Sequence, residues 1–354
     1  MTSILNRQVN ATDLVQSGDF LGFSLSFPEH HPAFDYVTEQ GIRVEVWDSG
    51  IACLTPAQST TQDIVLSCGI HGNETAPIEL VAKLVQDILT GVLPLTCRLL
   101  VLIGNPPAIN AAKRELVDNL NRLFSGHHSK GDFTPSWERS RAALLEQAVL
   151  RFYQSVEEGR HRALYDLHTA IRGSVHEKFA VYPFLHGEPW SEAQLRFLAA
   201  CGVNTFLLMQ TPASTFSYFA AQTAKAHGFT LELGKVRPFG QNDMSRFAEC
   251  DTMLRKLLSG VGLDLAPFAE IAFHFFVVSR SINKQTEQFK LCFANDIENF
   301  TQFPLGTVLA EDGGAQITVD EVGEAIIFPN ANVALGQRAM LLVKPTDIRG
   351  QTAP

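Results

Sequence analysis

The chain has 354 residues, of which 45% are hydrophobic and 18% are charged, as in an ordinary globular protein with one large domain and a smaller one. Its 28 lysines and arginines stand against 37 aspartates and glutamates, which gives a net charge of −9 with no block of like charge. An acidic chain without a basic stripe is a poor candidate for binding nucleic acid or an anionic membrane.

Apolar runs that predict buried strands alternate with helical periodicities between residues 61 and 260, after a first segment of short elements and turns. Strands are expected at 63–70, 98–103, 163–167, 205–209 and 229–233. Helices are expected at 75–91, 134–159, 190–201 and 242–258, the first with Thr75 as its N-terminal cap and Pro77 in its first turn. This alternation predicts an α/β domain with a parallel or mixed sheet, in which ligands bind at the carboxyl ends of the strands.

The pattern changes after Gly260, beyond which no long helical period is found. Short strands separated by Gly, Pro, Asn and Asp are expected at 271–278, 288–293, 307–310, 325–328 and 339–343. We therefore expect a catalytic α/β domain over residues 1–260 and a smaller all-β domain over residues 261–354.

Cysteine usage and hydropathy bear on where the protein resides. The six cysteines are scattered and form no C-x-x-C pair, which indicates free thiols in a reducing compartment rather than a disulfide scaffold. Residues 1–10 lack the apolar region of a secretory signal, and the most apolar stretch, 271–278, is too short to span a bilayer. These features predict a cytoplasmic protein.

Two polar motifs follow apolar, strand-like runs and suggest a metal site. His71 and Glu74 lie three residues apart just before a helix, and an imidazole with a carboxylate suits Zn²⁺. Alone, this pair is more typical of a surface histidine and an acidic residue at a helix start than of a metal site. His168 follows a third strand; alone it is typical of a structural histidine, but with the pair it completes a set that leaves the fourth zinc position open. Asp166 is expected either to orient a ligand or to shape the turn.

Two further motifs supply candidates for acid–base chemistry and substrate binding. Glu232 lies between Leu231 and Leu233, so its carboxylate either reaches a solvated face or sits in a dry setting beside a metal-bound water. Arg114 and Arg122 belong to a polar segment that is either a solvated loop or a clamp for carboxylates and an oxyanion.

Together these motifs resemble the succinylglutamate desuccinylase and aspartoacylase family, which is similar in fold to the zinc carboxypeptidases. The resemblance rests on residues 71–79, 105–108, 118–126, 166–172 and 232–242, which occur in family order. It implies a mixed sheet flanked by helices with a smaller C-terminal all-β domain. It also implies an amidohydrolase that converts N-succinyl-L-glutamate to succinate and L-glutamate, the last step of arginine catabolism by the succinyltransferase route.

The resemblance assigns roles to individual residues. His71, Glu74 and His168 are implied to hold one Zn²⁺ per subunit, and Glu232 is implied to be the general acid/base for a zinc-activated water. The family pattern further implies that the scissile carbonyl is polarised by Arg114 and that a substrate carboxylate is bound by Asn121 and Arg122.

Other residues near the motifs receive weaker assignments. The substrate carries three carboxylates, so Arg172 is also expected to bind one, whereas Lys235 and Arg237 are as readily explained as solvated loop charges. Asn119 stands where relatives often carry Asp, which affects a contact beside the ligands but not the ligand set. The histidine pairs 30–31 and 127–128 are interpreted as solvated, and His176 as lining the pocket rather than binding metal.

Alternative functions remain open at this point. One is an aspartoacylase-like, carboxypeptidase-like or other N-acyl amino acid deacylase, and another is a zinc-binding protein without catalysis. The partner is expected to be a small-molecule substrate, with no nucleic acid and no membrane, and the sequence is compatible with a homo-oligomer. The β-rich tail is expected to rim the mouth of the active site.

Overall fold

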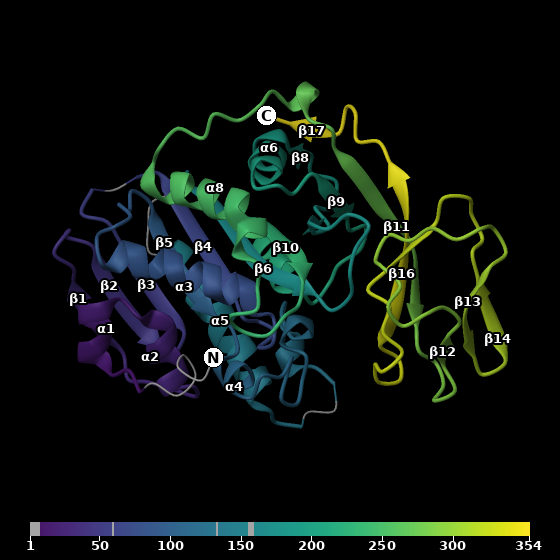
Figure 1. Cartoon of the computed structure of the whole chain (residues 1–354), viewed down its shortest axis with the longest axis horizontal. Coiled ribbons are helices and arrows are strands. Elements are labelled where there is room, and N and C mark those ends of the chain that lie inside the picture. The colour runs from purple at the N-terminus through teal and green to yellow at the C-terminus, as the bar shows by residue number, and fades with distance from the viewer. Residues whose placement is uncertain (1–7, 59, 132–133, 155–158) are drawn as a thin grey trace.

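A computed structural model describes residues 8–58, 60–131, 134–154 and 159–354 (Figure 1). Within this part of the chain, one large mixed sheet of 12 strands runs in the order β1-β2-β3-β5-β4-β6-β10-β7-β9-β11-β16-β15. Its N-terminal edge is the antiparallel set β1 (Phe34–Val37), β2 (Arg43–Asp48) and β3 (Ile51–Thr55). These three strands lie in the segment for which the sequence predicted only short elements.

The centre of the sheet consists of four neighbouring parallel strands. They are β5 (Arg98–Ile103), β4 (Gln62–Cys68), β6 (His161–Ala170) and β10 (His227–Lys235). All six residues of β5 are buried, because their alternating side chains face a helical layer on either side. Such strands give the continuous apolar runs from which 63–70, 98–103, 163–167 and 229–233 were predicted, and these four predictions are confirmed within a few residues.

Helices cover both faces of the sheet, and each face has its own apolar core. One face carries α1 (Ala11–Ser17), α2 (Phe20–Ser26), α3 (Thr75–Leu89), α6 (Glu192–Ala200) and α8 (Ala248–Ser259). The other carries α5 (Trp137–Gln154) and α7 (Phe216–Gln222). The short helices α4 (Pro106–Asn110), η1 (Leu120–Arg122), η2 (His127–Ser129), η3 (Met244–Phe247) and η4 (Phe268–Glu270) lie in connecting segments.

All four predicted helices begin differently from expectation, and the one expected from 242 begins as α8 at Ala248, after η3. Thr75 does not cap α3, because Glu74 is the N-cap residue and the Thr75 hydroxyl instead donates to the Arg237 carbonyl at 2.7 Å. The helix expected from residue 134 begins at Trp137, and residues 155–158 of that prediction lie outside the described part. The helix expected from 190 begins at Glu192, because β8 (Trp190–Ser191) pairs with β17 (Thr352–Ala353).

The C-terminal part is rich in strands, as predicted, but several of them extend the main sheet. β7 (Phe179–Tyr182) and β9 (Thr205–Leu208) lead from the centre to β11 (His274–Asn283), β16 (Arg338–Thr346) and β15 (Ala325–Ile327). A separate three-stranded sheet contains β12 (Lys290–Leu291), β13 (Val308–Asp312) and β14 (Ala315–Thr318). The division at residue 260 stays a prediction.

The cysteines and the helix lengths bear on the expected compartment. All six cysteines are free thiols, five of them buried and Cys292 exposed. In the described ranges, every helix is too short or too polar to cross a bilayer. The cytoplasmic location remains a prediction.

Candidate active site

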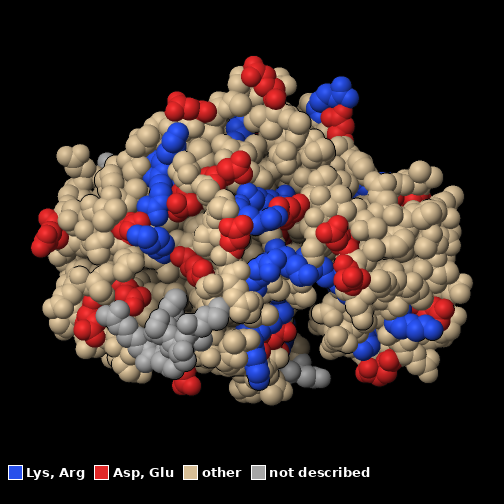
Figure 2. All heavy atoms as spheres, viewed as in Figure 1, with Lys and Arg blue, Asp and Glu red and all other residues tan. Residues whose placement is uncertain are grey.

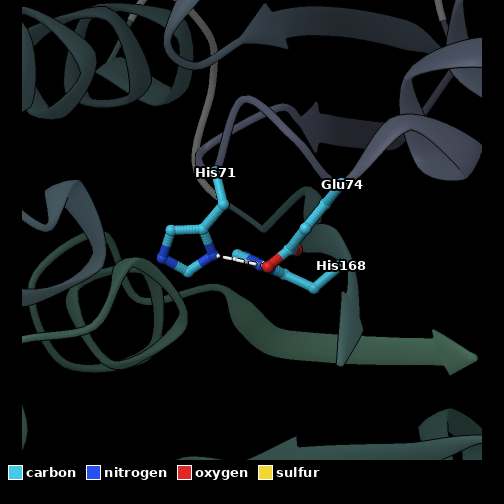
Figure 3. A group of neighbouring side chains, drawn as sticks. All are labelled: His71, Glu74 and His168. Carbon is cyan, nitrogen blue, oxygen red and sulfur yellow. Dashed lines mark hydrogen bonds and ion pairs between the residues drawn. The ribbon is translucent and has the colours of Figure 1, made fainter. Parts of the chain in front are cut away.

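Three buried side chains meet at the carboxyl ends of the central strands (Figure 3). His71 lies in the turn between β4 and α3, Glu74 is the N-cap residue of α3, and His168 lies near the end of β6. The two Nδ1 atoms are 3.2 Å apart, and each lies 2.9 Å from a different oxygen of Glu74. The three predicted ligands therefore converge on one point.

The turn that carries His71 depends on a glycine. A Cβ atom at Gly72 would lie 2.4 Å from the carbonyl carbon of Ala108, which real contacts do not allow. The backbone N–H of Gly72 also donates to the Arg114 carbonyl at 3.0 Å. Only glycine lets this turn pack directly against α4 and the segment that follows it.

The outward nitrogen of each histidine is held by a second residue. Nε2 of His168 donates to Asp166 Oδ2 at 2.7 Å, and the hydroxyl of Ser67 donates to Asp166 Oδ1 at 2.8 Å. Nε2 of His71 donates to the amide oxygen of Asn119 at 3.1 Å. Asp166 thus orients a predicted ligand, and the residue that departs from the family pattern still contacts the other one.

The buried charges around the group shift the pKa of each of its three side chains. Burial and the nearby Arg114 lower the pKa of His71 to about 4, so its imidazole is neutral at pH 7. Burial alone would raise the pKa of Glu74, but His71, His168 and Arg114 outweigh it and hold the pKa well below the usual range. Burial would lower the pKa of His168, but Asp166 and Glu74 raise it.

The donor set fits a single zinc ion. Ligand atoms of the two imidazoles and one carboxylate lie within 4.8 Å of one another. Nδ1 of each histidine faces the shared point while Nε2 is held by an oxygen acceptor, which is the usual arrangement of metal-binding histidines. Three protein ligands of this kind leave one position for water or substrate, as in catalytic zinc sites.

Glu232 lies beside the group because β10 and β6 pair in parallel with Glu232 opposite His168. Its side chain is buried, and its Oε2 has no hydrogen-bond partner among the described residues. Burial and the neighbouring carboxylate of Glu74 raise the pKa of Glu232 to about 7, although His168 and Arg114 act in the opposite direction. A carboxyl group with this pKa can both accept and donate a proton near neutral pH.

Arg114 lies next to the ligands, where its Nη1 donates to Glu74 Oε1 at 2.5 Å. The segment that carries it is held by a buried glutamate that the sequence analysis missed. Glu138 Oε1 accepts hydrogen bonds from the backbone N–H groups of Leu116 at 2.8 Å and Val117 at 3.3 Å. No local motif marks Glu138, because it lies on α5, inside an ordinary helical pattern.

The three predicted substrate-binding residues all line the same cleft, which has a volume of about 830 Å³. The amide oxygen of Asn121 accepts from the Phe216 N–H at 3.0 Å, so it also fixes the start of α7. Arg122 donates through Nη1 to the Asn121 carbonyl at 2.9 Å. Arg172 donates through Nε to the Pro329 carbonyl at 3.0 Å and through Nη1 to the Asn295 carbonyl. Their roles toward substrate stay predictions.

The cleft lies between the α/β part and the C-terminal strands, and basic side chains gather there (Figure 2). Segment 328–338, which leads into β16, contributes part of its lining. Among these residues is Arg338, which lies outside every motif found in the sequence. Only the fold brings it next to the motif residues.

The other histidines and basic residues singled out in the sequence lie in different surroundings. His176 packs against His274, Phe276 and Phe300, and it does not line the cleft among the described residues. Of the histidine pairs, His30 bonds Asp48 and the His31 ring packs against Phe23, while His127 is exposed and His128 bonds Glu146. Lys235 and Arg237 lie away from the lining of the cleft.

Known proteins match nearly the whole chain. Residues 60–258 match the succinylglutamate desuccinylase/aspartoacylase catalytic domain, and residues 272–346 match the AstE/AspA barrel-sandwich hybrid domain. The chain is 49% identical over 335 residues to the succinylglutamate desuccinylase of Shewanella frigidimarina, covering 94% of this chain and 97% of that protein. It is 51% identical over 312 residues to the one of Idiomarina loihiensis, covering 88% and 91% respectively.

Solved structures agree with these matches. The crystal structure of the succinylglutamate desuccinylase of Chromobacterium violaceum has a TM-score of 0.80 and 41% identity, covering 94% of this chain and 98% of that chain. The corresponding X-ray structure from Vibrio parahaemolyticus has a TM-score of 0.84 and 35% identity, covering 93% and 95%. The predicted fold class and the resemblance found in the motifs are confirmed. The chain belongs to the succinylglutamate desuccinylase/aspartoacylase family of enzymes.

Proposed function

We propose that this enzyme hydrolyses the amide bond of N-succinyl-L-glutamate to give succinate and L-glutamate, the last step of arginine catabolism by the succinyltransferase route. The names of the relatives that align over nearly their full length support this substrate. The observation that carries the chemistry is the position of Oε2 of buried Glu232, which has no hydrogen-bond partner in the described part of the chain, beside the convergent group His71, Glu74 and His168.

The proposed metal is one zinc ion held by His71, Glu74 and His168. When bound, zinc supplies a Lewis acid that polarises a carbonyl and lowers the pKa of water from about 16 to about 7. Asp166 and Asn119 orient the two imidazoles through their Nε2 atoms. The carboxylate of Glu74 also accepts from the Thr169 N–H at 3.0 Å, which fixes its position.

Glu232 is the proposed acid–base residue. Its unprotonated carboxylate takes a proton from the attacking water at Oε2, and the same oxygen later delivers that proton to the leaving amine nitrogen. A pKa of about 7 makes both steps accessible near neutral pH. The guanidinium of Arg114 donates to the oxygen of the scissile carbonyl, and loss of one such donor typically costs about 3–4 kcal/mol of barrier.

The charge of the cleft suits this substrate although the chain as a whole is acidic. N-succinyl-L-glutamate carries three carboxylates, and an acidic protein needs local positive charge to hold it. The cationic residues that line the cleft outnumber its acidic residues: they are Arg114, Arg122, Lys130, Arg139, Arg172 and Arg338, against Glu74, Glu115, Asp118 and Glu232. Guanidinium groups match the geometry of carboxylates, so this lining favours a polycarboxylate over a neutral acyl amino acid.

The test is the Glu232→Gln variant, in which an amide of nearly the same shape replaces the carboxyl group. We expect turnover of N-succinyl-L-glutamate to fall about 10²- to 10⁴-fold, while the zinc content stays at one per chain. The variant Glu270→Gln, at an exposed position, serves as the control. Unchanged activity in Glu232→Gln would refute the mechanism. Faster turnover of N-acetylaspartate or of a C-terminal peptide by the parent enzyme would replace the substrate assignment.

A further inference from the structure

Arg338 is the first residue of β16 and lies in the wall of the cleft. Its position is fixed by the strand, because the Arg338 backbone pairs with Asn283 of β11. The preceding residues 328–337 form the rim on this side, and the Asn330 N–H ties that rim back to the strand through the Ala339 carbonyl at 2.7 Å. The side chain is half-buried and faces the same space as the predicted substrate-binding residues.

Arg338 has no ion-pair partner within the described part of the chain, unlike other arginines of the C-terminal part. Arg280 bonds Asp320 at 2.6 Å and Glu324 at 2.8 Å, and exposed Arg349 bonds Asp347. A guanidinium withdrawn from water without an anionic partner costs free energy, so natural proteins usually pair it. The exception at Arg338 faces a cleft rather than the apolar core.

The guanidinium of Arg122 adds to the free-energy cost of leaving Arg338 unpaired. Arg122 also forms no ion pair with a carboxylate of the described residues, and it donates a hydrogen bond to the neutral carbonyl of Asn121. Burial, Arg338 and Arg114 together lower the pKa of Arg122 to about 9, because neighbouring positive charges disfavour another cation in a buried place. An anion that reaches both groups would relieve the repulsion and accept charge-assisted hydrogen bonds.

We propose that Arg338 binds a carboxylate of the substrate next to Arg122, so that the C-terminal strands supply a specificity-determining residue of the active site. This inference rests on the proposed function, because it takes the substrate to be an N-acyl amino acid with several carboxylates. The group that Arg338 would bind is a carboxylate on a short flexible chain. In the proposed substrate it is one of the three carboxylates of N-succinyl-L-glutamate.

The test compares the parent with Arg338→Gln on four substrates. Besides N-succinyl-L-glutamate, three analogues each lack one carboxylate: N-butyryl-L-glutamate, N-succinyl-L-norvaline and N-succinyl-4-aminobutyrate. We expect kcat/KM for the full substrate to fall about 10- to 150-fold, mainly through KM, because a hydrogen bond to a charged group is lost. The analogue that lacks the contacted carboxylate should be hydrolysed equally by both proteins, and this identifies the source.

Two further variants and a binding measurement complete the design. Arg338→Lys should recover part of the lost kcat/KM, and the control Arg349→Gln should match the parent on every substrate. Calorimetric titration with succinate and with L-glutamate should show weaker binding of at least one of them to Arg338→Gln than to the parent. Thermal unfolding checks that each variant is folded. If Arg338→Gln is not folded, Arg338→Lys replaces it in the comparison with the parent.

The outcomes separate this inference from the proposed function. Equal losses on all four substrates, or no loss on any, would overturn the role of Arg338, and so would unchanged binding of both products. If the zinc-loaded parent does not hydrolyse N-succinyl-L-glutamate, the proposed function fails instead. In that case the two product titrations still decide whether Arg338 binds a carboxylate.

Discussion

Replacing Asp166 by Asn tests whether the charge behind His168 sets the affinity for zinc. Asp166 is fully buried, accepts from His168 Nε2 at 2.7 Å through one oxygen, and accepts from the Ser67 hydroxyl at 2.8 Å through the other. Asparagine has nearly the same shape, and the Ser67 hydroxyl can rotate to accept from the new amide group. The substitution therefore removes the charge while it keeps both contacts.

The expected size of the effect follows from what the carboxylate does. A buried carboxylate makes the imidazole of His168 a more basic ligand and fixes its orientation, and losing such a partner typically weakens metal binding about 10- to 100-fold. This corresponds to about 1.4–2.7 kcal/mol. The neutral Asn119 already fills the corresponding place behind His71, where its Oδ1 also accepts from the Asn121 N–H at 3.1 Å. Asn119→Asp keeps these acceptors and should tighten zinc binding.

The assay is a competition between the metal-free protein and a chelator of known zinc affinity at fixed pH. Ser67→Ala is the matched control, because it removes a contact of Asp166 but leaves the carboxylate and its bond to His168. We expect weaker binding in Asp166→Asn, tighter binding in Asn119→Asp and little change in Ser67→Ala. An Asp166→Asn variant that binds zinc as tightly as the parent, or a Ser67→Ala variant that loses as much, would refute the reasoning.

Three further predictions concern stability and packing. Burial alone would raise the pKa of Glu324, but hydrogen bonds from Arg280, Ser279 and the Asp320 N–H lower it. The ionised Glu324 therefore stabilises the fold at neutral pH, and this stabilisation is lost as the pH falls through the lowered pKa. Glu324→Gln should lower the free energy of unfolding by about 1–3 kcal/mol at pH 7, because Arg280 keeps its ion pair with Asp320. It should also flatten the loss of stability below pH about 4, and a parent-like acid unfolding curve would contradict this. Gly72→Ala should weaken zinc binding, because the new Cβ would collide with the Ala108 backbone. Gly262→Ala is the control and should not change zinc binding, because only Asp264 lies near its new Cβ, at 3.9 Å. Titration with a chelator compares the two variants. Zinc at 1,000 times its Kd should stabilise the protein by about 4 kcal/mol, and thermal unfolding that does not respond to zinc would exclude a bound ion in the folded state.

The sequence was most informative where one local pattern has one structural solution. The run 98–103 was predicted to the residue, because a central parallel strand is buried on both faces and the five positions after Arg98 are all apolar. The convergence of His71, Glu74 and His168 followed from strand ends that must meet at one edge of such a sheet. Strands β1 and β2 were missed because their mixed burial leaves no continuous apolar run, whereas β3 was missed although its first four residues are apolar and buried.

The remaining differences arise from contacts between distant parts of the chain. Thr75 looked like a helix cap, but its hydroxyl bonds the backbone of Arg237, which a local pattern cannot reveal. Trp190 and Ser191 left the predicted helix because a strand near the C-terminus pairs with them. Part of the tail also continues the main sheet, because β11 pairs with β9. In each case tertiary pairing overrode local propensity.

The arrangement separates the groups that would perform the chemistry from those that would select the substrate. Neighbouring strands β4, β6 and β10 carry or precede His71, His168 and Glu232, and their parallel register fixes these groups relative to one another. The opposite wall of positive charge includes Arg338, which depends on the pairing of β16 with β11 and not on the central strands. Substitutions in segment 328–338 can therefore change which carboxylates are accepted while the metal ligands keep their positions. If they changed zinc affinity as strongly as Asp166→Asn, the two functions would not be separable in this fold.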